Sequence, residues 1–121
     1  MNEHRLTALE HLFGEKYDNE IPLPSELATF YGHLSFPAHA DRPYIIGNFV
    51  STLDGVVTLN VRGHNGGGDI SGFNRQDHML MGLLRAISDA IIVGAGTLRA
   101  ARNHRWTASY IYPPLADAYQ Q

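Results

Sequence analysis

Apolar residues in the second half of the chain follow two kinds of pattern that succeed each other. Short unbroken apolar runs alternate with a stretch in which apolar residues recur every three or four positions. An unbroken run rich in β-branched residues is typical of a buried strand, whereas the recurring spacing is typical of a helix with one apolar face. The patterns predict strands over 44–51, 56–59 and 90–93, and helices over 80–87 and from 98 to 102.

This order of strand, loop, helix, strand and helix is typical of an α/β fold with a mainly parallel sheet and right-handed crossovers. Asn74 or Ser71 can cap the start of the helix that contains residues 80–87. Residues 62–69 include three consecutive glycines, which predict a mobile loop. We further expect extended chain over 109–112 and the start of a helix over 115–119.

The first 42 residues read as an extension rather than a domain, because they are too short and too often broken by proline to form a core. Helical spacing predicts one helix over 6–13 and a second over 25–31, with Ser25 as the N-cap of the second. The boundaries are therefore an acidic, partly helical extension at 1–42 and an α/β unit at 43–121.

Charge separates the same two parts of the chain. Residues 1–27 carry six acidic and two basic side chains, whereas the rest carries six aspartates and seven arginines without lysine. A net charge of −3 argues against general nucleic-acid binding, which needs a basic face. Arginine alone suits bidentate recognition of phosphate or carboxylate, although it can equally reflect compositional habit. The absence of a membrane-length apolar run and of a signal peptide favours a cytoplasmic protein.

The segment 91–97 is the strongest candidate for a binding site. A predicted strand ends in Gly94, Gly96 and Thr97, and a helix is expected to follow. Small residues at such a turn let a phosphate approach the backbone, and Thr97 adds a hydroxyl. Arg99 stands where a dinucleotide-binding GxGxxG motif needs its third glycine, so we exclude that motif. A tight turn that needs small residues for packing explains the same pattern.

Other candidates lie at the predicted strand and helix ends. Asp54 follows the first strand, at the edge where ligands bind in open α/β sheets, or it is simply a turn residue before Gly55. Arg85 lies beside the apolar helix face, where it either reaches solvent or holds an anion. Asp77 and His78 begin that helix, where a carboxylate either protonates or orients a heterocycle or is an ordinary first-turn charge.

Several classes of chemistry find no support in the sequence. The chain has no cysteine, which excludes disulfides, thiolate metal sites and a thiol nucleophile. Its seven histidines show no HxH or HExxH spacing, and the glycine triplet lacks the Lys-Ser/Thr that completes a P-loop. No G-x-S-x-G elbow for a nucleophilic serine occurs.

Three segments together resemble the reductase domain of riboflavin biosynthesis, the C-terminal part of the bifunctional deaminase–reductase. The segments are Gly47–Val57, Asp69–Gly72 and Leu83–Ala100. The resemblance implies a dihydrofolate-reductase-like, three-layer α/β fold with a mainly parallel sheet, incomplete in this chain. It also implies NADPH as cofactor, a pyrimidine-nucleotide-like substrate whose ribosyl group is reduced to ribityl, and a homodimer. No nucleic-acid or membrane partner is expected.

The resemblance assigns roles to individual residues. It places Ser51 and Thr97 on the NADPH side, Gly67 to Asp69 in the segment that touches substrate and cofactor, and Arg85 at the substrate phosphate. Together with the candidates above, the predicted cofactor-binding residues are Ser51, Asp69, Gly94, Gly96 and Thr97, and the predicted substrate-binding residues are Asp54, Gly67 and Arg85. It names no catalytic residue and no metal ligand.

The chain departs from the family after residue 100. The family has an acidic residue near position 101, where this chain has Ala101. In addition, the resemblance covers only the N-terminal half of the family's reductase domain. Hydride transfer needs the nicotinamide held against the acceptor carbon, so we expect little or no activity from this chain alone. The alternatives are a non-enzymatic nucleotide-binding or oligomerisation module derived from that fold, and a structural partner whose sheet edge a second chain completes.

Overall fold

The computed structural model describes residues 6–64 and 66–121, which fall into two compact units. The first unit extends to Gly47 and includes Gln121, and the second covers Asn48–Gln120. The division lies five residues beyond the predicted boundary at residue 42.

The first unit is built around one short helix between two short strands. Strands β1 (Glu20–Ile21) and β2 (Leu34–Ser35) pair antiparallel, and α1 (Ser25–Tyr31) connects them. Leu27 on α1 and Leu34 on β2 are buried and form the small apolar centre of this unit. The predicted second helix is therefore confirmed, although its N-cap position is occupied by the preceding proline, Pro24.

The predicted helix over residues 6–13 is wrong, because this segment is irregular. Leu12 and Phe13, which should have formed its apolar face, are 84% and 95% exposed. The backbone N–H of Leu9 instead donates to the carbonyl of Phe30, at 2.7 Å. A helix of this length is marginal without a surface on which to bury its apolar face.

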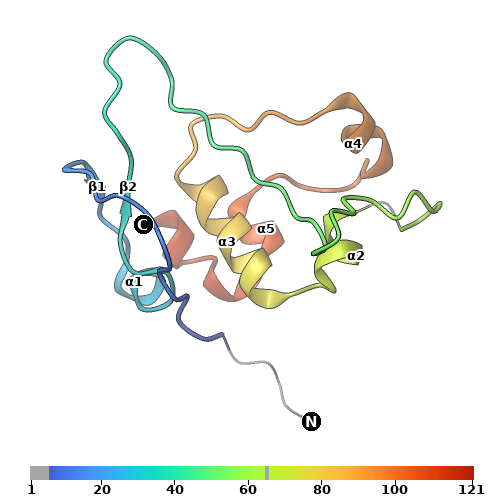
Figure 1. The fold of residues 1–121 in the computed structure, drawn as a ribbon, viewed down its shortest axis with the longest axis horizontal. Helices are drawn as coiled ribbons and strands as arrows, with labels where there is room; N and C mark the ends of the chain where they lie inside the picture. Colours follow the sequence, from blue (N-terminus) through green and yellow to red (C-terminus); the bar gives the residue numbers. More distant parts are fainter. Residues whose placement is uncertain (1–5, 65) are drawn as a thin grey trace. The chain divides into compact units, whose positions relative to one another are not determined.

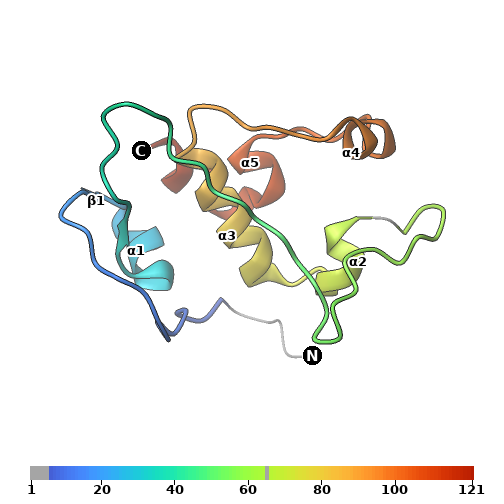
Figure 2. The same ribbon diagram turned by 45° about the horizontal axis from the view of Figure 1, so that its top comes forward.

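The second unit is helical. Its elements are α2 (Gly67–Ser71), α3 (Arg75–Ala86), α4 (Ala95–Ala100), α5 (Ala108–Ile111) and the 3₁₀ turns η1 (Pro113–Leu115) and η2 (Ala118–Gln120). Helix α3 lies beside α5 and packs against η2 (Figure 1), and Figure 2 shows the same α3–α5 neighbourhood from a second direction. The buried residues at this contact are Met79 and Leu83 of α3 with Tyr112, Leu115 and Ala118.

Helix α3 confirms the prediction for residues 80–87 and shows where it begins. The Asn74 side chain caps it by accepting hydrogen bonds from the backbone N–H groups of Gln76 and Asp77, at 2.9 and 3.2 Å. Of the two predicted caps, the structure therefore uses Asn74. With 12 residues, α3 is the longest helix described, and none of the helices in the described part of the chain could span a bilayer.

The predicted three-layer, dihydrofolate-reductase-like fold with a parallel sheet is wrong. Within residues 6–64 and 66–121, β1 and β2 form the only sheet, and Figure 1 draws arrows at these two elements alone. Residues 44–51, 56–59 and 90–93 are irregular, although their apolar runs predicted strands. A strand exists only where a neighbour pairs with its backbone, and a side-chain pattern cannot supply that neighbour. Phe49 and Ile92 are accordingly 90% and 93% exposed.

Three local predictions also change. The glycine-rich loop continues only to Gly66, because α2 begins at Gly67 and the Asp69 carboxylate accepts the Gly66 N–H at 3.2 Å. The extended chain expected over 109–112 is the helical turn α5. The helix expected over 115–119 is replaced by the 3₁₀ turns η1, which begins with Pro113 and Pro114, and η2.

Candidate functional site

The densest group of polar and aromatic side chains in the second unit surrounds Arg85. Arg85 lies in the last turn of α3 and is half-buried. Its Nη1 donates to Nε2 of His104 at 3.3 Å, and its guanidinium lies over the Trp106 ring, 5.3 Å from the ring centroid. Arginine has donors only, so Nε2 of His104 must be the acceptor and this imidazole is neutral.

Aromatic contacts hold the His104 ring in place. It meets the Trp106 ring edge-on at a centroid distance of 4.5 Å, and the Tyr110 ring of α5 at 5.0 Å. The indole Nε1 of Trp106 is buried and has no hydrogen-bond partner. A buried donor without an acceptor costs free energy, so this N–H is a feature that calls for an explanation. We refer to Arg85, His104 and Trp106 as the Arg85 cluster.

The surroundings of the Arg85 cluster disfavour additional positive charge. Burial lowers the pKa of Arg85, and burial followed by the charge of Arg85 lowers the pKa of His104. Within the described residues, the ion pairs are His33–Glu20 and His64–Asp69, so no carboxylate neutralises Arg85 there. The cluster therefore offers N–H donors and a positive charge, and its acceptor capacity is limited to the single His104 nitrogen.

Asp54 lies in a tight turn. The Thr52 N–H donates to the Val56 carbonyl at 3.0 Å, the Thr52 hydroxyl bonds the Asp54 carboxylate, and Gly55 has a φ of +87° that favours glycine. The sequence allowed two roles for Asp54, a ligand-binding residue or a simple turn residue. The geometry is that of a turn residue. Ser51, which directly precedes the turn, is exposed.

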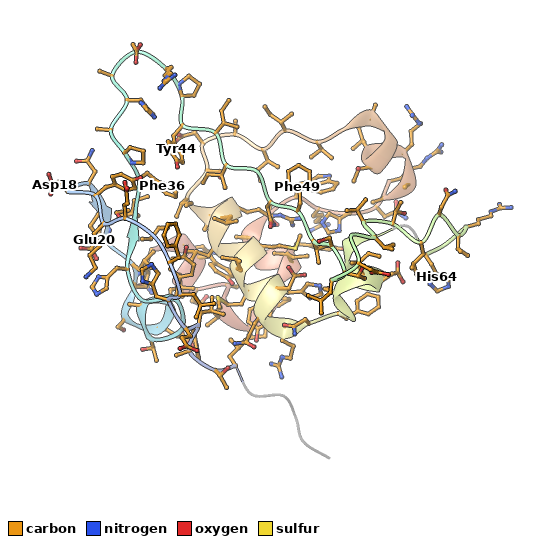
Figure 3. All side chains as sticks on the ribbon, in the orientation of Figure 1. Asp18, Glu20, Phe36, Tyr44, Phe49 and His64 are labelled. Carbon is orange, nitrogen blue, oxygen red and sulfur yellow. The ribbon has the colours of Figure 1, made fainter. Side chains whose placement is uncertain are left out.

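Gly67 and Asp69 lie together at the start of α2. A Cβ added at Gly67 would come within 3.1 Å of Cγ1 of Val50, so α2 packs closely against the residue next to Ser51. The Asp69 carboxylate accepts from Nδ1 of His64 at 3.0 Å as well as from the Gly66 N–H. The hydrogen bond from His64 lowers the pKa of Asp69 most, and the Gly66 N–H lowers it further. Figure 3 labels His64 at the outer part of its loop.

Gly94, Gly96 and Thr97 lie at the start of α4 and are exposed. A Cβ at Gly94 or Gly96 would meet nothing within 4 Å, and neither residue has a positive φ. The fold of this chain therefore does not itself require glycine at either position. The backbone at both positions is open.

The structure groups only some of the predicted site residues. Ser51, Asp54, Gly67 and Asp69 belong to neighbouring segments of one loop region. Within residues 6–64 and 66–121, no hydrogen bond or ion pair joins these residues to Arg85 or to the α4 residues. Arg99, Arg102 and Arg105, the arginines that follow Thr97 in the chain, are exposed.

His104, Trp106 and His64 were not predicted from the sequence. The signal for the first two was available, since the only tryptophan of the chain stands two residues after a histidine in an arginine-rich segment. His64 precedes the glycine triplet and had no recognisable partner, because its bond to Asp69 depends on the turn formed in between.

Comparisons of the chain with protein-family models, curated proteins and solved structures found no match. In the described part of the chain, no group of three or more histidine, aspartate or glutamate side chains is arranged to hold a metal ion.

Proposed function

We propose that this chain contributes the phosphate-binding part of an NADPH-dependent reductase of the riboflavin-biosynthesis pyrimidine type. The observation that carries the proposal is the Arg85 cluster, in which a half-buried guanidinium has no carboxylate partner among the described residues. An anion is the natural complement of such a group, because arginine pairs bidentately with phosphate. In the proposed substrate, a ribosylamino-pyrimidine phosphate, the 5′-phosphate is that anion.

NADPH is the cofactor of the proposed reaction and supplies the hydride when bound. Gly94, Gly96 and Thr97 are the residues of this chain that would lie against its phosphates, since their backbone is open and unobstructed. By resemblance of the sequence to the family, Ser51 is assigned to the cofactor side, and Gly67 and Asp69 to the segment that touches substrate and cofactor.

We propose that the chain alone is inactive. Hydride transfer requires cofactor and substrate to be held at near-contact distance. Within residues 6–64 and 66–121, no hydrogen bond or ion pair joins Gly94, Gly96 or Thr97 to the Arg85 cluster, and Ser51 is exposed. The chain would therefore bind a phosphate ligand without reducing it.

The experiment is a fluorescence titration of the purified chain with NADPH and, separately, with a ribosylamino-pyrimidine phosphate. Binding of either ligand without consumption of NADPH supports the proposal. Robust NADPH oxidation contradicts the proposed inactivity, and absence of binding for both ligands contradicts the reductase assignment. Gly96→Ala serves as the matched variant for NADPH, because a methyl group there fills the open space without meeting protein atoms.

The second candidate is a non-enzymatic module that associates with another chain, including a second copy of itself. It is favoured by large apolar side chains on the irregular segments, since Phe49, Leu53 and Ile92 are almost fully exposed. Exposed apolar groups in such number mark interaction surfaces. A folded dimer that binds neither ligand, measured by light scattering with circular dichroism, would favour the module.

A further inference from the structure

The contact between Arg85 and His104 depends on the protonation state of one imidazole. His104 accepts the Arg85 Nη1–H at 3.3 Å through Nε2, which leaves its proton on Nδ1. If His104 gained a second proton, it would lose this acceptor and stand as a cation beside a cation. The two side chains therefore hold each other only while His104 is neutral.

The groups around His104 contain nothing that would neutralise its protonated form. The titratable or charged side chains that face it are Arg85 from α3 and Tyr110 from α5, and the third neighbour is the neutral Trp106 ring. Within the described residues, no carboxylate bonds either His104 or Arg85. The missing negative charge must come from a ligand if both side chains are to be cationic together.

The number of unused hydrogen-bond donors in the Arg85 cluster also indicates an anionic ligand. The Trp106 Nε1–H is buried without a partner, and the guanidinium has five N–H groups of which one is used by His104. A tetrahedral oxyanion carries several acceptor oxygens, so it can receive donors from Arg85, His104 and Trp106 at once.

We propose that His104 is a second anion-binding residue of the Arg85 site and that it takes up a proton when a phosphate or another dianionic oxyanion binds. This inference rests on the proposed function for the identity of the phosphate, and it adds proton uptake by His104 and a donor role for Trp106. On binding, the proton passes from solvent to the Nε2 lone pair, the Arg85–His104 hydrogen bond breaks, and both cations face the anion. The lowered pKa of free His104 agrees with a residue that is neutral until the anion arrives.

Sulfate is the probe for the test, because it is a dianion that does not titrate near neutral pH. Trp106 is the only tryptophan of the chain, so its fluorescence reports binding at the cluster. We expect the affinity for sulfate to rise by up to about tenfold per pH unit as the pH falls from about 8 to 6, the limit for one coupled proton. Calorimetry in two buffers of different ionisation enthalpy should give uptake of up to one proton.

Three variants separate the roles. His104→Gln keeps a side-chain acceptor and donor but cannot titrate, so it should bind sulfate with little pH dependence. Arg85→Lys keeps the charge and should bind sulfate more weakly, because the bidentate fork of the guanidinium is lost. His33→Gln, in the first unit, should retain the pH dependence of the unaltered chain.

A pH-independent sulfate affinity in the unaltered chain overturns the inference, and so does the absence of any fluorescence response at high sulfate concentration. An unchanged pH dependence in His104→Gln overturns the assignment to His104. These results are distinguishable from failure of the proposed function, which is decided by NADPH and the pyrimidine ligand. Proton-coupled sulfate binding without binding of either NADPH or the pyrimidine ligand would leave the anion site standing and contradict the reductase assignment.

Discussion

The hydroxyl of Tyr119 lies directly over Gly82 of α3 and donates a hydrogen bond to the carbonyl of Met79, at 2.9 Å. A Cβ added at Gly82 would come within 2.5 Å of the Tyr119 oxygen and 2.6 Å of Cζ. Gly82 is buried in the middle of α3, where glycine is otherwise unfavourable by about 1 kcal/mol. The close approach of Tyr119 explains why a glycine occupies this position.

Gly82→Ala is expected to lower the free energy of unfolding. Overpacking of a closed contact costs about 1–3 kcal/mol, and it outweighs the gain in helix propensity of about 1 kcal/mol. Urea unfolding followed by circular dichroism measures the change. In a Tyr119→Ala background the methyl group finds space, so the same substitution should become neutral or stabilising there. Equal effects in the two backgrounds would contradict the contact.

Stability at alkaline pH is expected to depend on Tyr119. Burial, followed by the nearby Tyr112, raises the pKa of Tyr119 far above its usual value. A phenol with a raised pKa contributes stability that is present below the pKa of the unfolded chain, about 10, and that is lost as the pH rises above it. The melting temperature of the unaltered chain should therefore fall more steeply with pH above about pH 10 than the melting temperature of Tyr119→Phe. Parallel curves would show that this tyrosine does not carry the effect.

The Asn74 cap is expected to stabilise α3 by about 1 kcal/mol. Its side-chain oxygen accepts the backbone N–H groups of Gln76 and Asp77 in the first turn of the helix. Asn74→Ala should lower the urea midpoint accordingly, without changing the dependence of the unfolding free energy on urea concentration. Asn74→Ser, which can accept the same hydrogen bonds, is the matched control and should remain close to the unaltered chain.

The sequence predicted helices α1 and α3, but it also predicted a helix over 6–13 that does not form. α3 has helical spacing of apolar residues and a capping asparagine, and both are properties of neighbouring residues. α1 was predicted for the same reason. The positions of greatest burial on α3 are Met79 and Leu83, so its apolar face is shifted from the predicted set of Leu80, Leu83, Leu84 and Ile87.

The predicted strands failed because a strand depends on a partner far away in the chain. Residues 44–51 and 90–93 have the composition of buried strands, but no ladder forms in the part of the chain that the structure describes. The α2 helix was not predicted for a different reason. Its first residues are glycines, which have a low helix propensity, and the hydrogen bond from the Gly66 N–H to the Asp69 carboxylate stabilises the start of the helix.

The candidate site also has one part that the sequence predicted and one part that it did not. Arg85 was chosen because a charged residue stood beside an apolar helix face, and the structure places it half-buried. His104 and Trp106 lie 19 and 21 positions further along the chain. Only the return of the chain after α4 brings them to Arg85, so no local pattern could have predicted their contact.

Acid stability is expected to depend on the contact between His64 and Asp69. The hydrogen bond from Nδ1 of His64, helped by the Gly66 N–H, lowers the pKa of Asp69. A carboxylate with a lowered pKa contributes stability above the pKa of the unfolded chain, about 4, and this contribution is lost as the pH falls below that value. Asp69→Asn removes the titrating group, so its unfolding free energy should fall less steeply between about pH 5 and pH 2. His64→Gln should flatten the same curve in part, because Asp69 then keeps only its backbone partner. If His64→Gln leaves the pH dependence of the unfolding free energy between about pH 5 and pH 2 unchanged, the histidine does not set the pKa of Asp69.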